Sequence, residues 1–213
     1  MKIFHIALLC AVCAAPVHAQ KVHAYNLAQL VKENKLVVSN PKFAVKAMDN
    51  SEKPAVSVAG VAWLKDIHFK EGTIDIDLRG KNVFLQSFLG IAFHGVDSIR
   101  YDAVYFRPFN FRHADTLRRK WSVQYFSLPE YDYDKLRKDH PLVYENAVTP
   151  VPEPDDWFHA TIVIKDNWVT VYVNHSAIAS LKVRMLNERA DGNIGLWSAG
   201  EVNGVFANLT ITE

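Results

Sequence analysis

The sequence predicts an all-β fold in which antiparallel strands form a sandwich or a barrel. From about residue 55 onward, short segments rich in β-branched and aromatic residues follow one another along the chain. Turn-forming pairs separate these segments: Glu71-Gly72, Arg79-Gly80 and Asp191-Gly192. Many short strands joined by polar turns are typical of a sandwich or barrel, and not of alternating strands and helices.

The expected strands alternate in polarity or are rich in β-forming residues. In chain order they are Val56–Trp63, Thr73–Leu78, Leu89–Phe93, Ala103–Phe106, Ser122–Phe126, Ala160–Ile164, Val169–Val173, Gly192–Trp197 and Val205–Ile211. The clearest pair is the hairpin of Ala160–Ile164 and Val169–Val173, because the turn formers Asp166 and Asn167 lie between them. Alternation directs one set of its side chains to the core: Ile162, Ile164, Val169, Val171 and Val173.

Four other regions depart from the strand pattern. Asn26 is placed to cap a short helix that runs to about Lys32, and Tyr133–Asp139 is expected to form a helical turn that ends before Pro141. Residues 148–156 contain three prolines and are expected to form an extended surface connection. Residues 107–121 form a basic loop, and long loops on a sandwich often carry function.

The first residues predict a signal peptide. Lys2 precedes a stretch from Ile3 to Val12 that is apolar apart from His5, and Val17-His18-Ala19 supplies the small residues that a signal peptidase reads. The apolar run is too short to span a bilayer with margin. We therefore expect a signal peptide at 1–19, an N-terminal segment at 20–54 that joins the sandwich, and the sandwich itself at 55–213. The protein is then exported, to a periplasm or out of the cell.

Charge and cysteine content exclude several classes of protein. Lys and Arg together number 24 against 23 for Asp and Glu, so nothing indicates a nucleic-acid or membrane-surface partner. No stretch beyond the signal peptide approaches transmembrane length. Both cysteines, Cys10 and Cys13, lie within the signal peptide, which leaves the mature domain without a disulfide or thiol site. The histidines show no metal-ligand spacing, so no metal site and no cofactor are indicated.

Several stretches together carry a known pattern: Glu71–Asp77, Gly90–Phe93, Trp157–His159 with the hairpin that follows, Gly192–Trp197 and Gly204–Leu209. In this order they resemble the concanavalin A-like lectin and glucanase superfamily. The order is most similar to that of exported bacterial 3-keto-disaccharide hydrolase-like and laminin-G-like domains. The resemblance covers roughly residues 55–213. It implies an all-β, two-sheet antiparallel jelly-roll sandwich that handles carbohydrate, in a bacterial host.

The resemblance identifies the fold better than the reaction. Laminarinase-like hydrolases of this superfamily carry Glu-x-Asp-x-Glu on one strand, and the nearest run here, Asp75-Ile76-Asp77, lacks both glutamates. A laminarinase-type retaining mechanism is therefore not expected. Calcium is left open by analogy with related lectins, although the Asp and Asn residues are scattered.

Asp75 and Asp77 are the candidate catalytic residues. They lie two apart on one strand and so share a face, with Cα atoms roughly 6.5–7 Å apart. Flexible carboxylates at that spacing fit either geometry of sugar hydrolysis and select neither. The alternative is that both carboxylates simply face solvent.

A second candidate set lies in the middle of the chain and would bind substrate. Val104 and Phe106 suit the core, which directs Tyr105 and Arg107 to the opposite face. Gln124 is expected to share that face, and Asn110 follows at its rim. Tyr, Arg, Asn and Gln together offer the donors and acceptors that sugar hydroxyls need. The alternative is a structural network in which Arg107 fixes a loop through backbone carbonyls.

Aromatic residues near the basic loop are candidates for stacking walls: Trp121, Tyr131 and Tyr133. Arg137 and Glu145 complete the pocket in one interpretation and form an ion pair that holds the Pro141 turn in the other. The remaining tryptophans lie in or beside strands and are expected in the core: Trp63, Trp157, Trp168 and Trp197.

The sequence therefore predicts an exported carbohydrate-active protein, first as a glycoside hydrolase-like domain acting on a di- or oligosaccharide. The alternative is a non-catalytic carbohydrate-binding or cell-envelope recognition domain. In either case the partner is a carbohydrate ligand or substrate, with no nucleic acid and no membrane span.

Overall fold

The computed structural model describes residues 20–38, 40–49 and 51–213. The expected signal peptide at 1–19 lies outside the described residues. In the part of the chain that is described, no helix is long and apolar enough to cross a lipid bilayer.

The helices and strands have the following bounds in chain order. The strands are β1 (Val22–Tyr25), β2 (Leu36–Val38), β3 (Ala44–Met48), β4 (Ala55–Phe69), β5 (Gly72–Arg79), β6 (Phe88–Gly95), β7 (Asp102–Phe106), β8 (Val123–Ser127), β9 (Glu145–Asn146), β10 (Phe158–Lys165), β11 (Trp168–Val173), β12 (Leu181–Arg184), β13 (Gly192–Ala199) and β14 (Gly204–Thr212). The helices are α1 (Leu27–Lys32), α2 (Pro108–Phe111), α3 (Thr116–Arg119) and α4 (Tyr133–Asp139).

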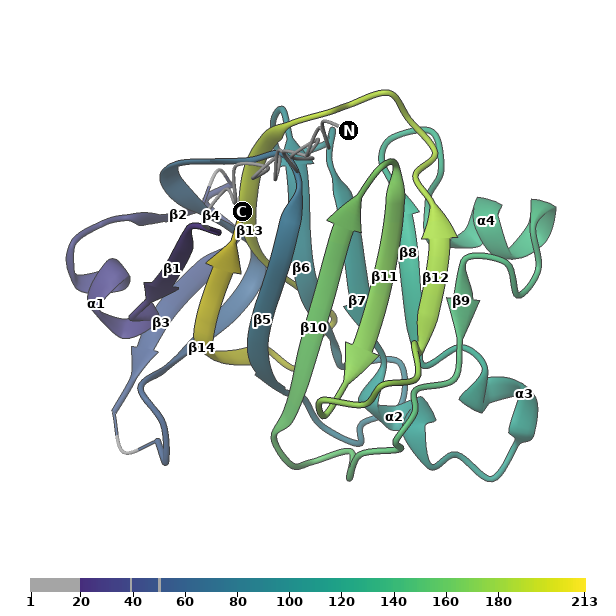
Figure 1. The fold of residues 1–213 in the computed structure, drawn as a ribbon. Coiled ribbons are helices and arrows are strands. Elements are labelled where there is room, and N and C mark those ends of the chain that lie inside the picture. Colours follow the sequence, from purple (N-terminus) through teal and green to yellow (C-terminus); the bar gives the residue numbers. More distant parts are fainter. Residues whose placement is uncertain (1–19, 39, 50) are drawn as a thin grey trace, which may run out of the picture.

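The strands form two antiparallel sheets that share β4, and Figure 1 shows one sheet behind the other. The first sheet has the order β12-β11-β10-β5-β14-β4, and the second has the order β4-β13-β6-β7-β8-β9. Strands β1 and β3 extend the first sheet by pairing with β14 and β4, and β2 pairs with the second half of β4. Gly60, with φ of +82°, lies where β4 passes from one sheet to the other. Glycine adopts this left-handed conformation without steric cost.

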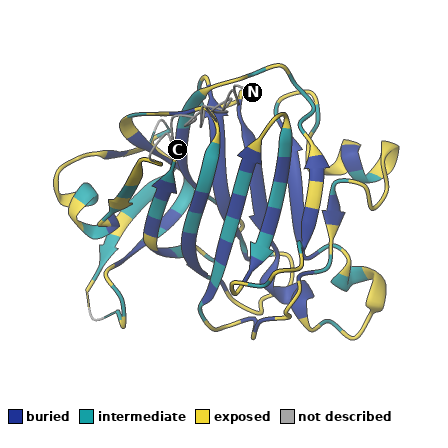
Figure 2. Ribbon diagram, viewed as in Figure 1, coloured by how far each residue is buried: buried dark blue, intermediate teal, exposed yellow. Residues whose placement is uncertain are grey.

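The core lies between the two sheets and follows from the alternation of the strands. Figure 2 shows buried and partly exposed residues alternating along β5 and β10. The expected hairpin is confirmed, with Ile164 opposite Val169 and all its inward residues buried. These residues belong to one cluster with the inward residues of the second sheet: Leu89, Ile91, Phe93, Val104 and Phe106. The all-β sandwich that the sequence predicts is therefore confirmed.

Both expected helices are present. The Asn26 side chain accepts a hydrogen bond from the Gln29 amide, which caps α1, and the Asp132 side chain does the same for α4 through the Lys135 amide. The basic loop is more ordered than expected, because it contains α2, which has Pro108 at its start, and α3. Residues 148–156 contain neither helix nor strand, as expected.

The second sheet is buried on both faces, so the side chains that point away from the core are packed as well. Every residue of β7 and β8 is buried, although alternation directs half of them away from the core. The outward side chains form a second apolar layer with the segment between β8 and β9, which includes α4: Val61, Trp63, Ala92, Tyr101, Ala103, Tyr105, Phe126 and Leu136. The expectation that Trp63 is buried is correct, but it packs in this layer and not between the sheets.

Candidate functional site

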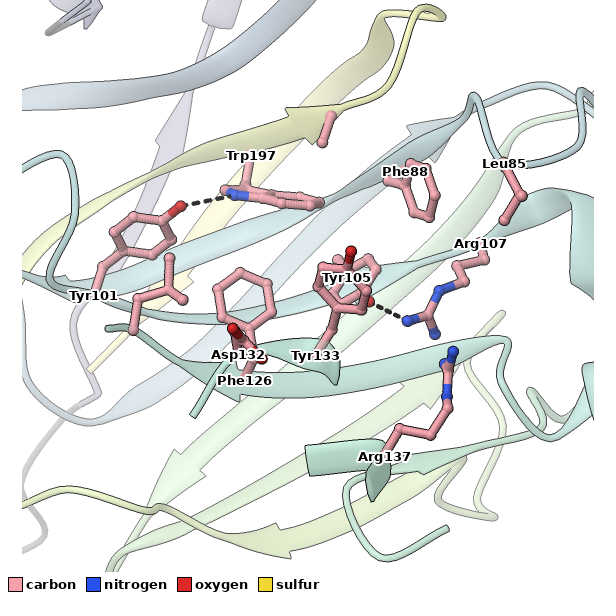
Figure 3. Close-up of a pocket in the computed structure, with 12 residues that line it drawn as sticks. Leu85, Phe88, Tyr101, Tyr105, Arg107, Phe126, Asp132, Tyr133, Arg137 and Trp197 are labelled. Atoms are coloured by element: carbon pink, nitrogen blue, oxygen red, sulfur yellow. Dashed lines mark hydrogen bonds between the residues drawn. The ribbon is translucent and has the colours of Figure 1, made fainter. Parts of the chain in front are cut away.

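A pocket of about 560 Å³ opens on this outer face of the second sheet. Aromatic rings from four strands and an adjoining loop surround it in Figure 3: Phe88, Tyr101, Tyr105, Phe126 and Trp197. Asp132, Tyr133 and Arg137, at the start of α4 and within it, form one wall. Leu85, Arg107, Leu128 and Ala199 complete the lining. The pocket is therefore largely apolar, with a few polar groups at its edges.

The strand pattern correctly predicts the face of Tyr105 and Arg107. Both point away from Val104 and Phe106, and Gln124 is opposite Tyr105 on the neighbouring strand. The Tyr105 hydroxyl donates a hydrogen bond to Oε1 of Gln124 at 2.8 Å. Nη2 of Arg107 donates to both of these oxygens. These three side chains are almost fully buried and form one hydrogen-bonded network.

Arg107 also fixes the basic loop, as the structural interpretation of the sequence proposed. Its Nη1 donates a hydrogen bond to the backbone carbonyl of Trp121 at 2.8 Å. Nδ2 of Asn110 donates to the same carbonyl at 3.1 Å. Arg107 thus lines the pocket and holds the loop, whereas Asn110 and Gln124 lie behind the lining.

Arg137 both lines the pocket and pairs with Glu145. Its Nε and Nη2 donate to the two carboxylate oxygens at 3.1 and 2.6 Å. Nη1 of Arg107 lies 3.8 Å from the same carboxylate. Arg137 therefore does what both interpretations of the sequence expected, because it lines the pocket and forms an ion pair with Glu145.

Burial sets the protonation states in the network. It raises the pKa of Tyr105 to about 12, so the phenol stays neutral and acts as a hydrogen-bond donor and acceptor. Burial lowers the pKa of Arg107, but a guanidinium remains charged at every physiological pH. Tyr105 is therefore unsuited to act as a general base near neutral pH.

The aromatic residues divide differently from the sequence expectation. The Trp121 ring lies 4.3 Å below the Arg137 guanidinium and supports it from behind the lining. Tyr131 packs beside the second apolar layer, while Tyr133 lines the pocket. Trp197 was expected in the core, and this is wrong: it is half-buried and lines the pocket. Alternation along β13 was the available signal, because Ile194 and Leu196 take the core positions.

Asp75 and Asp77 lie on the other sheet. They are on β5, and their shared face points away from the core that separates the two sheets. His159 of β10 lies between them, with Nδ1 2.8 Å from Asp77 and Nε2 3.1 Å from Asp75. The structure therefore does not bring these carboxylates together with the pocket, and their catalytic role stays a prediction.

The partners of these two carboxylates form an outer-face cluster. The Thr161 hydroxyl donates to Asp75 at 2.6 Å, and the Asn208 amide donates to Asp77 at 2.8 Å. Nζ of Lys53 lies 2.6 Å from Asp77. Burial alone would raise the pKa of Asp77, but the hydrogen bonds from Lys53, His159 and Asn208 outweigh it and lower the pKa.

We expect Asp77→Asn to lower the free energy of unfolding at neutral pH by about 1–3 kcal/mol, because the ionised carboxylate holds three partners. A carboxyl group with a lowered pKa stabilises the fold at neutral pH, and this contribution is lost as the pH falls below about 4. Urea unfolding at neutral pH and near pH 3 should therefore find the two proteins converging in acid. Asp155→Asn, at an exposed position, is the control; a gap equally large at both pH values would contradict the prediction.

Comparisons with known proteins identify the fold. No family model matches the chain, and no curated protein matches it. A structure with a galectin-like fold, a Bacillus subtilis protein of unknown function, superposes with a TM-score of 0.56 at 11% identity, covering 89% of this chain and 94% of that one. The carbohydrate-binding module CBM66 from Bacillus subtilis superposes with a TM-score of 0.54 at 11% identity, covering 79% and 94%. The fold is a concanavalin A-like jelly roll. The resemblance seen in the sequence is thus confirmed at the level of this jelly roll, and at these identities the likeness shows the fold alone.

Proposed function

We propose that this protein is an exported carbohydrate-recognition domain that holds a sugar in the pocket without cleaving it. The observation that carries the proposal is the set of six aromatic side chains that line a pocket with few polar groups. Ligand pockets of about 300–1,000 Å³ are lined mainly by apolar and aromatic side chains, with a small number of polar groups that orient the ligand. The apolar faces of a sugar ring suit the aromatic side chains, and its hydroxyls suit Tyr133, Asp132 and Arg137.

The carboxylates near the pocket favour binding over hydrolysis. Glycoside hydrolysis generally uses two carboxyl groups that flank the scissile bond. Asp132 lines the pocket, but its Oδ1 accepts the amide of Lys135 and caps α4. Glu145 is almost fully buried and is held by Arg137 through two hydrogen bonds. Asp75 and Asp77 lie across the core, so a hydrolase would need a pair that this pocket does not supply among the described residues.

One structural neighbour is named as a carbohydrate-binding module, so the jelly roll is a fold on which carbohydrate binding occurs, although fold alone does not assign function. Export rests on the composition of residues 1–19 and is proposed with the function.

We expect Trp197→Ala to weaken sugar binding by roughly 30-fold, because a buried aromatic residue at the centre of an interface often contributes 2 kcal/mol or more. A glycan array first identifies ligands for the protein, and calorimetry then measures the affinity of the best ligand for both forms. Trp168→Ala is the matched control, since Trp168 is a half-buried tryptophan on the first sheet that carries Lys182 and Arg184 against its ring.

The same experiment distinguishes sugar recognition from sugar hydrolysis. Binding that is lost in Trp197→Ala and kept in Trp168→Ala, without sugar products on chromatography, supports recognition. Turnover of the bound glycan would replace recognition by hydrolysis. The absence of binding to every glycan on the array would overturn the proposal.

A further inference from the structure

One end of the pocket carries more positive than negative charge. Arg107 and Arg137 point their guanidinium groups toward one another there, as Figure 3 shows. Glu145 is the only carboxylate that pairs with either of them among the described residues, and it meets both. Two guanidinium groups share one carboxylate, so this end of the pocket keeps a net charge of about +1.

Burial makes this surplus charge costly. Arg107 is 4% exposed and Glu145 is 2% exposed, so water screens neither group well. The hydrogen-bond acceptors around Arg107 are neutral: the Tyr105 hydroxyl, the Gln124 amide oxygen and the Trp121 carbonyl. Glu145 is already committed to Arg137, with Oε2 2.6 Å from Nη2 of Arg137 but 3.8 Å from Nη1 of Arg107. Buried charges in proteins are normally paired.

Other charges in the pocket do not remove the surplus. Asp132 also lines the pocket, but it is exposed to water and it caps the first turn of α4. Within the described chain, the hydrogen bonds of Arg137 to Glu145 use Nε and Nη2, which leaves Nη1 available to a ligand. A group that brought one negative charge to this end would balance the site.

We propose that the sugar bound in this pocket is an acidic one, whose single oxyanionic group docks at the Arg107–Arg137 end while its ring packs on the aromatic side chains. This inference rests on the proposed function and names the class of ligand for the same site. Guanidinium groups bind carboxylate and sulfate oxygens through charge-assisted hydrogen bonds, so the shared chemistry is a sugar-borne oxyanion.

The test uses glucose- and galactose-based disaccharides, each in three forms: neutral, oxidised at C6 to the uronic acid, and sulfated at C6. We expect the full protein to bind an acidic form about 10- to 100-fold more tightly than its neutral form, the range expected for a hydrogen bond to a charged group. Preference for the uronic acid or for the sulfate identifies the source of the oxyanion, and either result supports the inference.

Variants of the ion pair change the local charge in steps. Arg137→Gln leaves Arg107 with Glu145, which brings the local charge to zero. The acidic form should then bind no more than roughly threefold more tightly than the neutral form. Glu145→Gln leaves two unopposed guanidinium groups and should increase the preference. The double variant Arg137→Gln/Glu145→Gln restores a charge of about +1 and should recover much of the preference lost in Arg137→Gln.

Two controls exclude simpler explanations. Arg184→Gln removes one positive charge from the first sheet, where Arg184 lies against Trp168, and should leave the preference unchanged. Thermal unfolding of each variant shows whether it is folded under the conditions of the binding assay. Recovery in the double variant cannot arise from loss of fold, because that variant carries both substitutions.

The outcomes separate this inference from the function on which it rests. Neutral forms that bind as tightly as acidic ones would overturn the inference and leave sugar recognition in place. A preference for acidic forms that is identical in Arg137→Gln and in the unchanged protein would also overturn it. If no glycan binds at all, sugar recognition fails and the inference fails with it.

Discussion

Replacing Asp102 by alanine is expected to lower the free energy of unfolding by about 3–5 kcal/mol, the usual cost of removing one partner from a buried charged pair. Asp102 is fully buried at the start of β7. Its carboxylate accepts hydrogen bonds from the Tyr125 hydroxyl at 2.5 Å and from the Asn187 amide at 2.6 Å. Arg189 donates to the other oxygen at 3.2 and 3.3 Å. Burial and the charge of Asp102 together raise the pKa of Tyr125 well above its ordinary value.

The network joins β7 and β8 to the segment between β12 and β13, so its loss should affect both. In Asp102→Ala, the Arg189 guanidinium loses its counter-charge and the Tyr125 hydroxyl loses its acceptor. Urea unfolding followed by circular dichroism measures the change. Asp191→Ala, an exposed aspartate of the same segment, should cost less than about 0.5 kcal/mol. A loss below about 1 kcal/mol in Asp102→Ala would mean that the network contributes no more than an ordinary hydrogen bond.

Arg107→Met should lower the free energy of unfolding by roughly 2–4 kcal/mol. Methionine fills much of the same volume, but it cannot donate to Tyr105, Gln124 or the Trp121 carbonyl. Two of these acceptors keep a second donor, because Tyr105 still bonds Gln124 and Asn110 still bonds the carbonyl. The loss is therefore expected to be smaller than that of Asp102→Ala.

Denaturant unfolding measures the loss of stability in Arg107→Met and in a control, Arg118→Met. Arg118 lies on α3 in the same loop, with its guanidinium 4.7 Å from the centre of the Phe84 ring, and its loss should cost less than about 1 kcal/mol. Equal losses in the two variants would show that Arg107 does not hold the loop. Arg107→Met should also bind sugar more weakly, since it removes a cation from the lining of the pocket.

Local patterns predict much of the architecture. Alternation places the side chains of the β10–β11 hairpin correctly, and it directs Tyr105 and Arg107 to the face opposite Val104. A capping residue, Asn26, predicts the first helix, and the stop before Pro141 predicts the second, because both signals act over a few neighbouring residues. These features depend on neighbours in the sequence, which is why the sequence is sufficient to find them.

The pocket depends on pairings between distant strands, and these were not predictable. Trp197 donates a hydrogen bond to Tyr101, which lies 96 residues earlier in the chain. Its position on the outer face follows from alternation, but the second apolar layer that makes this face a site needs the pairing of β13 with β6. The same limit applies to Asp75 and Asp77, because the register of β5 with β10 places His159 between them. Short strands such as β12 were missed because few residues carry their signal.

The wall of the pocket comes from a single excursion of the chain between two neighbouring strands. Residues 128–144 leave β8 and return as β9, which pairs with β8 again. The entropic cost of closing such an excursion grows only slowly with its length, so residues can be added or exchanged there at small cost to folding. The aromatic side chains of the strands and the residues of the wall thus lie on separate segments of the chain. Substitutions within residues 128–144 should therefore change the wall of the pocket while the strands that carry its aromatic side chains stay as they are.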